Sequence, residues 1–417
     1  MNPLKSIASV VRFKRFEANP SLRRLAKAAS VADLRRLAQR RLPRGVFDYI
    51  DGGAEDERTL SDNVSAFANV SFRPRVLRGL SDVRIGSSIL GKALEYPLIL
   101  APTGFTRIAD PQGELAVARS AARAGLPYTL STLSTRSIEE VRSVSDGRLW
   151  FQVYAWRDRG LLKEMIDRAA AARFEALVLT VDTAVLGRRE RDIRHGFSLP
   201  PTIGLKTIVD GVRHPSWTWS FIRSEPIRFA NVIGREVGDG ASPVRLSDYI
   251  NTQFDSGLSW RDVDWLRSVW DGPIVLKGVQ TVEDARLAVK VGVEAIALSN
   301  HGGRQLDGAP AILGLVAPVS DAVGGEIEII CDGGIRRGSD IVKAVALGAS
   351  AAMAGRAYLY GLGAAGEMGV DRVLEWFRND LIRTLNLIGV SSFEELDRTC
   401  LEFSPSAPPS LGINDGS

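Results

Sequence analysis

Eight short apolar runs recur along the chain, and they constrain its fold more than any other feature. Alanine- and charge-rich stretches of helical character separate them, for example 113–124, 161–172, 282–291 and 339–347. Parallel strands buried on both faces have continuous apolar sequences of this kind. Strands that alternate with helices in this way are typical of a parallel (β/α)8 barrel. The runs are 97–101, 128–131, 150–154, 176–181, 274–277, 295–299, 328–332 and 351–355.

The competing fold is a doubly wound open sheet. It needs a glycine-rich dinucleotide turn after the first strand, and the segment 101–105 is not one. The stretch 187–265 is far longer than an ordinary connection between a strand and its helix. We therefore predict an α/β (β/α)8 TIM barrel with an N-terminal helical segment and a long insertion after strand 4. The domains expected are a basic extension over 1–29, a barrel domain over 30–402 and a flexible tail over 403–417.

The composition excludes several classes of protein. Cys331 and Cys400 are the two cysteines, which give no disulfide framework and no metal-ligand spacing, so we predict no metal site. No apolar run is long enough to span a bilayer, and the N-terminus lacks the apolar core of a signal peptide. We therefore expect a cytoplasmic protein. It has a sizeable core, since 45% of its residues are hydrophobic.

The first 45 residues are strongly basic. Such a segment can be a nucleic-acid arm, a contact to an acidic membrane or the solvated face of a helix. Only Phe13 and Phe16 interleave with the charge as stacking platforms, so nucleic acid is not expected as a partner. Apolar residues at helical spacing indicate an amphipathic helix packed on the main body, namely Leu34, Leu37, Ala38 and Leu42.

Tryptophans and arginines interleave within the long insertion. Trp217, Trp219 and Phe221 lie between Arg213 and Arg223. This mixture suits a peripheral membrane contact over about 213–233, where an amphipathic segment lies among the lipid headgroups. The alternative is that the aromatics pack as a lid or as a subunit contact.

Polar side chains follow the C-terminal ends of the apolar runs. His301 and Arg304 lie in a glycine-rich loop directly after the sixth run. An imidazole at a strand tip, with a guanidinium three residues later, can remove a proton beside a carboxylate. A histidine that merely satisfies a backbone group in a turn is the plainer alternative. The ends of the strands meet at one mouth in a barrel, which favours a single site there.

Glycines and arginines follow the seventh and eighth runs, where barrels commonly hold a phosphate group. The phosphate could belong to a flavin nucleotide or to a phosphorylated substrate, and two glycine turns without a ligand are the alternative. Lys277 ends the fifth run, where it needs a negative partner such as a reduced flavin, a phosphate or a Schiff base. The two loops are Asp332-Gly333-Gly334-Ile335-Arg336 and Gly355-Arg356.

These motifs together resemble the FMN-dependent L-2-hydroxy acid dehydrogenase/oxidase family. The resemblance covers roughly residues 30–400, and the string Ser299-Asn300-His301-Gly302-Gly303-Arg304-Gln305 carries it most specifically. It extends to the loops after the seventh and eighth runs and to the early segment 47–56. The resemblance implies FMN over the barrel mouth, a small 2-hydroxy acid as substrate and a homo-oligomer, namely a tetramer.

The same resemblance implies a role for each matching position. Arg189 and Arg304 would bind the substrate carboxylate, His301 would act as the base, and Asp182 would orient it. Tyr49 and Tyr154 would contact the substrate's polar groups. The residues implied for FMN are Pro102, Thr103, Gly104, Ser131, Gln152, Thr180, Lys277, Ser299, Asp332, Gly333, Gly334, Ile335, Arg336, Gly355 and Arg356.

Three departures from the glycolate oxidase-like members refine this expectation. Leu133 replaces an aromatic residue, Gly104 replaces an alanine of several oxidases, and 184–185 replaces a Pro-Arg pair. With the long insertion, they favour a bacterial lactate or mandelate dehydrogenase that passes electrons to a quinone or other acceptor. We expect L-lactate as its substrate. Such an enzyme would be peripheral to the inner face of the cell membrane. The alternatives are an oxidase that releases peroxide and a non-catalytic barrel that binds a phosphorylated ligand.

Overall fold

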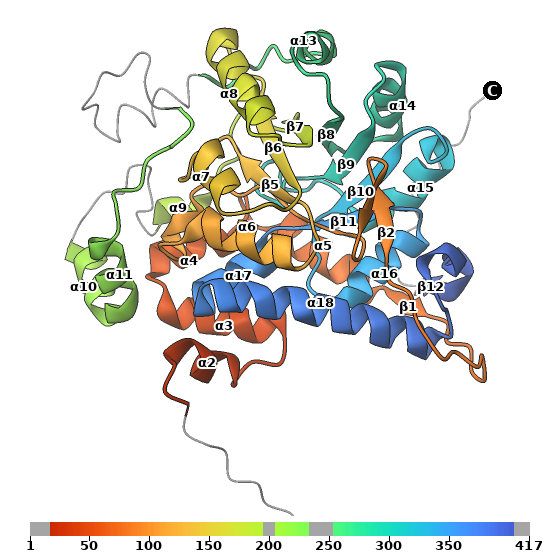
Figure 1. Ribbon diagram of the computed structural model, residues 1–417, viewed down its shortest axis with the longest axis horizontal. Coiled ribbons are helices and arrows are strands. Elements are labelled where there is room, and N and C mark those ends of the chain that lie inside the picture. The colour runs from red at the N-terminus through yellow and green to blue at the C-terminus, as the bar shows by residue number, and fades with distance from the viewer. Residues whose placement is uncertain (1–16, 195–204, 233–252, 404–417) are drawn as a thin grey trace, which may run out of the picture.

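The computed structural model describes residues 17–194, 205–232 and 253–403, which fold around a closed barrel of eight parallel strands (Figure 1). Each strand pairs with its neighbours in chain order, and the last strand pairs with the first. The prediction of a (β/α)8 barrel is confirmed. The strands are β4 (Leu98–Leu100), β5 (Tyr128–Ser131), β6 (Leu149–Tyr154), β7 (Ala176–Thr180), β8 (Ile274–Val279), β9 (Ala295–Ser299), β10 (Glu328–Asp332) and β11 (Ala351–Ala354).

Alternate residues of each strand face the two layers of the core. In β7, Ala176 and Val178 belong to the cluster inside the barrel, whereas Leu177 and Leu179 pack outward in the main core. The interior combines large side chains, such as Trp150 and Met353, with alanines. This pairing of large and small residues fills the barrel, so its interior is a packed core and not a pore.

The helices that follow the strands form a ring around the barrel (Figure 1). Their starts explain small shifts from the predicted boundaries. For example, the helix predicted from residue 161 begins at Arg159, because Asp158 caps it by accepting from the backbone N–H of Leu161. The ring comprises α6 (Gly113–Arg123), α7 (Ile138–Ser143), α8 (Arg159–Ala171), α13 (Arg261–Val269), α14 (Val282–Lys290), α15 (Leu313–Val323), α16 (Gly338–Ala346) and α17 (Arg356–Ala365).

Elements of the N-terminal part lie at both ends of the barrel. The hairpin β2 (Ser87–Ile89) and β3 (Lys92–Leu94) places Ile89 and Leu94 in the interior cluster, where they cover the barrel floor. Helix α4 (Arg44–Asp51) contributes to the cavity at the other end. The remaining elements are α5 (Arg58–Ala68), β1 (Val70–Phe72), η1 (Thr106–Ile108), α18 (Glu367–Ile388), η2 (Phe393–Glu395), η3 (Arg398–Cys400) and β12 (Leu401–Phe403).

The predicted amphipathic helix is α3 (Val31–Arg41), which packs on α17 through buried Leu34 and Ala38. The described part of the predicted basic extension includes a short helix. Helix α2 (Pro20–Leu25) buries Leu25 against the main body. Residues 1–16 and most of the predicted tail lie outside the described residues.

The described parts of the insertion include the helices α9 (Glu190–Arg194), α10 (Leu205–Arg213) and α11 (Pro215–Arg223). Helices α10 and α11 stand at the left edge of the molecule in Figure 1. The Trp217 indole N–H ties α11 to the barrel by donating to the carbonyl of Ile108 at 2.7 Å. Within the described residues, no helix is long and apolar enough to cross a membrane.

Candidate active site

A cavity of about 350 Å³ opens at the carboxyl ends of the barrel strands. Its volume lies in the range of small-molecule and cofactor sites. The structure brings the residues predicted for the site together here: all but two of them line the cavity. Asp182 and Ser299 do not line the cavity, but each hydrogen-bonds residues that do. The roles carried over from the resemblance remain predictions.

His301 and Asp182 form a hydrogen-bonded pair, in which the imidazole is 23% exposed. Nδ1 of His301 lies 2.9 Å from Oδ1 of Asp182, whose side chain is 3% exposed. Burial lowers the pKa of His301 against the opposing charge of Asp182, so the imidazole is neutral near pH 7. Burial would raise the pKa of Asp182, but the charge and hydrogen bond of His301 outweigh it and lower that pKa. A neutral imidazole beside a carboxylate can accept a proton and be stabilised as the cation.

The backbone around this pair fixes its geometry. His301 adopts a positive φ of 58° and donates its backbone N–H to Oγ of Ser299 at 3.0 Å. Gln305 donates from its side chain to the carbonyl of Asp182 at 3.0 Å. Gly278 is required beside Asp182, because a Cβ there would lie 2.8 Å from the Asp182 Cβ. The pair is therefore held by the loops after β7 and β9, with β8 packed behind Asp182.

Lys277 is buried in the cavity with a negative partner. Its Nζ lies 2.9 Å from Oδ2 of Asp332 and donates to Oγ of Ser299 at 3.0 Å. Burial lowers the pKa of Lys277, but the charges of Asp332 and Asp182 outweigh it, so the pKa is raised and the ammonium stays charged. This pairing was not foreseen. The Asp332 side chain is therefore occupied by Lys277. An anion bound to the loop after β10 would contact the residues that follow Asp332, and the backbone of the loop.

Two arginines border the opposite side of the cavity. Arg304 donates from Nη1 to the carbonyls of Tyr49 at 2.7 Å and Gly52 at 3.1 Å. Burial, and then the charge of Arg189, lower the pKa of Arg304 to about 9. The buried Nε of Arg189 has no hydrogen-bond partner in the part of the chain that the structure describes. Two partly buried guanidinium groups, one with an unpaired N–H donor among the described residues, form a site for an anion such as a carboxylate.

The loops after β10 and β11 form a cradle at another end of the cavity. Gly334 has a φ of 80°, and a Cβ there would lie 1.9 Å from the carbonyl oxygen of Asn63. Gly355 directly precedes α17, whose N-terminus carries unpaired backbone N–H groups. Arg336 also lines this end. Its charge and the helix terminus suit a phosphate.

Arg356 differs from the simplest expectation for a phosphate ligand. Its guanidinium donates to three backbone carbonyls, those of Ile50 at 3.1 Å, Gly302 at 2.8 Å and Gly52 at 2.8 Å. The side chain therefore ties α4 to the loop after β9. Because the guanidinium N–H groups already have partners, Arg356 would act on a bound anion through its backbone N–H and its positive charge.

A chain of polar side chains follows the ends of β5, β6 and β7. Ser131 donates from Oγ to Oε1 of Gln152 at 2.9 Å, and Gln152 donates from Nε2 to Oγ1 of Thr180 at 2.9 Å. Together with Lys277, these groups suit the polar edge of a heterocyclic ring. With the phosphate cradle and the apolar lining from Ala101 and Met353, the residues present fit FMN.

Several residues of the cavity were not among those singled out from the sequence. Phe229 lay within a recognised aromatic stretch, but nothing in the sequence places it in a site. Asp192 lay in a charge run, which is usually a solvated surface. Neither periodicity nor a motif marks Phe105 or Phe254. These additional lining residues include Ile50, Phe105, Leu186, Asp192, Phe229 and Phe254.

Comparisons with known proteins agree with this geometry. The sequence matches the family described as FMN-dependent dehydrogenase over residues 38–403, and the chain belongs to that family. It is 45% identical over 394 residues to a putative L-lactate dehydrogenase of Mycobacterium tuberculosis, covering 94% of each chain. It is 41% identical to an L-lactate dehydrogenase of Xanthomonas euvesicatoria pv. vesicatoria, covering 89% of this chain and 96% of the relative.

Solved structures give the same result. The monotopic membrane protein (S)-mandelate dehydrogenase is similar with a TM-score of 0.86 and 40% identity, over 90% of this chain and 99% of that one. A mandelate oxidase is similar with a TM-score of 0.77 and 39% identity, over 90% of this chain and 98% of that one. The family membership confirms the predicted cofactor, FMN, and the prediction of an enzyme over a non-catalytic barrel. No cluster of metal-ligating side chains occurs among the described residues.

Proposed function

We propose that the enzyme oxidises an L-2-hydroxy acid, L-lactate foremost, to the 2-oxo acid and passes the electrons to a quinone or other acceptor. The observation that carries the proposal is the convergence of the His301–Asp182 pair with Arg189 and Arg304 on one cavity. A base beside a double guanidinium clamp suits a substrate that has a carboxylate next to its reacting carbon.

The residues divide the work by their chemistry. Arg189 and Arg304 bind the substrate carboxylate and so orient the α-carbon. Tyr49 and Tyr154, which both line the cavity, hydrogen-bond the substrate's polar groups. His301 takes a proton from the substrate at its free ring nitrogen, Nε2, because Nδ1 faces Asp182. The Asp182 carboxylate then stabilises the imidazolium.

FMN, when bound, supplies the two-electron acceptor for this oxidation. Lys277 would supply a buried positive charge to offset the negative charge that reduction adds to the bound FMN. Ser131, Gln152 and Thr180 would hold the polar edge of the ring. The loops after β10 and β11 would hold the phosphate, with Arg336 supplying charge and the start of α17 supplying backbone N–H groups.

The first experiment uses the purified holoenzyme without oxygen. L-Lactate, glycolate and (S)-mandelate are each mixed with the yellow protein, and the loss of flavin absorbance is followed. Rapid bleaching by L-lactate and none by D-lactate supports the proposal. A flavoprotein that no 2-hydroxy acid reduces contradicts it.

The electron acceptor is tested separately, because an oxidase of the same family is the second candidate. The relatives cited above are named L-lactate dehydrogenases, whereas the structural neighbours include both a mandelate dehydrogenase and a mandelate oxidase. Peroxide yield under air is compared with turnover of a water-soluble quinone analogue. Quinone turnover that far exceeds peroxide formation supports the dehydrogenase, and stoichiometric peroxide supports the oxidase.

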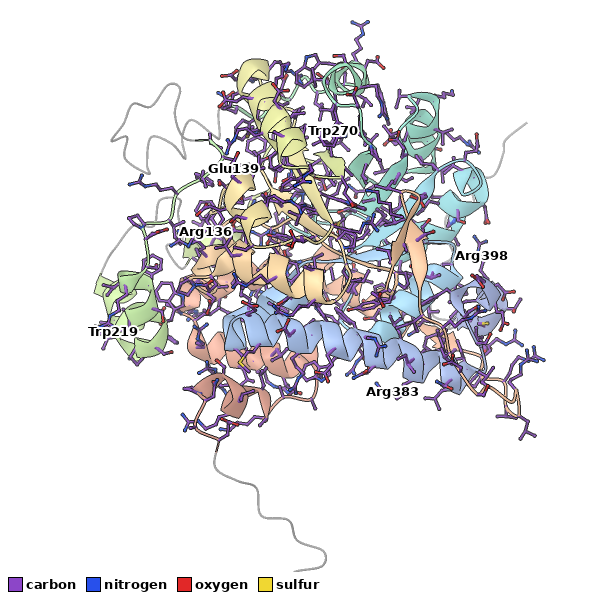
Figure 2. The ribbon with its side chains drawn as sticks, in the orientation of Figure 1. Arg136, Glu139, Trp219, Trp270, Arg383 and Arg398 are labelled. Carbon is purple, nitrogen blue, oxygen red and sulfur yellow. The ribbon has the colours of Figure 1, made fainter. Side chains whose placement is uncertain are left out.

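The surface of α10 and α11 favours a peripheral membrane location. Trp219 and Ile222 on α11 are 59% and 70% exposed, and Val212 on α10 is 73% exposed. Figure 2 shows Trp219 at the outer edge of the molecule. Arg223 lies over the Trp219 ring, 4.0 Å from its centroid. Exposed apolar side chains beside arginines suit an anionic lipid surface.

Vesicle sedimentation tests this contact. The double variant Trp219→Glu with Ile222→Glu should lose binding to anionic vesicles, since both side chains leave the apolar layer. Leu387→Glu is the matched control, because Leu387 is 68% exposed on α18. Binding that survives the double change contradicts this location. The expected homo-oligomer, a tetramer, is tested by sedimentation velocity.

A further inference from the structure

The described ends of the insertion return to the barrel mouth and are anchored there. At the first end, Arg107 donates to the carbonyl of Glu225 at 2.6 Å. The side chain of Asn231 accepts from the backbone N–H of Ile138 at 3.0 Å and donates to Oγ of Ser134 at 2.8 Å. The segment 225–232 is therefore fixed to the loops after β4 and β5.

The second end is anchored to the loop after β6. The backbone N–H of Arg157 donates to the carbonyl of Gln253 at 3.0 Å, and that of Asp158 donates to the Gln253 side chain at 3.1 Å. Phe254 forms an antiparallel bridge with Trp156. These contacts hold the Phe254 backbone beside the end of β6.

Each anchored end places one phenyl ring in the cavity wall. Phe229 is 7% exposed and meets Phe105 edge to face, with centroids 4.4 Å apart. Phe105 in turn lies edge-on to Tyr49 at 6.3 Å. Phe254 is 9% exposed and lies edge-on to Tyr154 at 5.1 Å. The insertion thus packs against Tyr154 directly, through Phe254, and against Tyr49 through Phe105. Both tyrosines match substrate-contacting positions.

The two phenyl rings make this part of the wall apolar, whereas charged side chains such as Arg189 and Lys277 line other parts of the cavity. Leu133 and Leu186 line the cavity together with the phenyl rings. A substrate held by its carboxylate at the arginines and by its hydroxyl at His301 has one substituent left, its side chain. If that side chain lies against the apolar wall, it has to be uncharged, because a charged group there would lose its hydration without gaining a partner.

We infer that the insertion selects 2-hydroxy acids with an apolar side chain, that Phe229 limits the size of that side chain, and that Phe254 positions Tyr154. The inference rests on the proposed function. Shortening Phe229 enlarges the pocket and so favours a bulkier substrate over L-lactate. Enlarging the same residue has the opposite effect, because overpacking excludes large groups.

The experiment compares kcat/KM for flavin reduction by (S)-mandelate and by L-lactate. Phe229→Ala should raise the mandelate-to-lactate ratio by about tenfold or more, as expected for a hydrophobic pocket changed by several carbons. Phe229→Leu should raise it less, and Phe229→Trp should lower it. Because the three variants move the ratio in a graded order and both directions, a folding defect does not mimic the result.

Two further variants sharpen the assignment. Phe403→Ala is the matched control, because Phe403 is 55% exposed on β12 and should leave the ratio unchanged. Phe254→Ala should lower kcat for both substrates alike, and Phe254→Leu should restore part of it. A flavin-loaded Phe229→Ala enzyme with an unchanged ratio overturns the inference. A wild-type enzyme that no 2-hydroxy acid reduces overturns the proposed function instead.

Discussion

Replacing Asp182 by asparagine isolates the charge that the structure places behind the base. The amide keeps an acceptor for Nδ1 of His301 but removes the negative charge 2.9 Å away. At an effective dielectric constant of about 20, two unit charges at that distance attract by roughly 6 kcal/mol. Part of this is recovered, because a neutral hydrogen bond remains. A net loss of about 3 kcal/mol in stabilising the imidazolium follows, which slows flavin reduction by roughly a hundredfold.

The pH profile gives the same variant a second signature. Burial lowers the pKa of His301, and Asp182 opposes that shift. Asp182→Asn therefore lowers the pKa of His301 further. The base is active when neutral, so the acidic limb of kcat/KM moves to lower pH even as the maximum falls. A structural defect would lower the rate without moving that limb.

Anaerobic stopped-flow measurements of flavin reduction across pH provide the assay, with Phe403→Ala as a control for handling. Rates within about threefold of wild type would refute the electrostatic argument, since roughly 0.7 kcal/mol is then all that the charge contributes. An acidic limb that moves to higher pH would refute the assignment of that limb to His301.

Three other changes test separate parts of the site and fold. Arg189→Lys should raise KM for the substrate by about tenfold or more, with a smaller change in kcat, because an ammonium cannot form two parallel hydrogen bonds to a carboxylate. A KM equal to that of the wild type contradicts this. Lys277→Met should lower the rate of flavin reduction. The inhibition constant for oxalate, a carboxylate inhibitor, should stay unchanged. Asp51→Asn should lower the free energy of unfolding by about 2 kcal/mol, because the buried Asp51 carboxylate loses its ion pairs with the half-exposed Arg35 and with Arg191. Burial would raise the pKa of Asp51, but the hydrogen bonds from Arg35 and Tyr360 outweigh it and lower the pKa to about 2. That stabilisation is present above about pH 4 and is lost as the pH falls toward 2, which urea unfolding at several pH values measures.

The barrel could be predicted from the sequence because its signal is local and repeated. Each strand is an apolar run, and the chemistry-bearing residues follow directly at the strand tips, as His301 does after β9. Closure of the barrel then brings residues distant in sequence to one mouth. Asp182 and His301 are 119 positions apart but meet through this closure.

The rest depended on contacts that no local pattern encodes. From the sequence, Arg356 beside a glycine is predicted to bind phosphate, but its side chain donates to carbonyls of α4 and of the loop after β9. The partner of Lys277 depends on the pairing of neighbouring strands around the barrel. Phe229 and Phe254 lie in an insertion without periodicity, so only their tertiary anchors place them in the cavity.

The central claim is that His301 is the base that removes a proton from a substrate held over bound FMN. The most direct test is single-turnover bleaching of the flavin by L-lactate in His301→Gln, without oxygen. The variant should remain yellow, because the predicted FMN contacts do not use the imidazole, and its bleaching should slow by about a thousandfold or more. Bleaching of the yellow variant at the wild-type rate would contradict the claim.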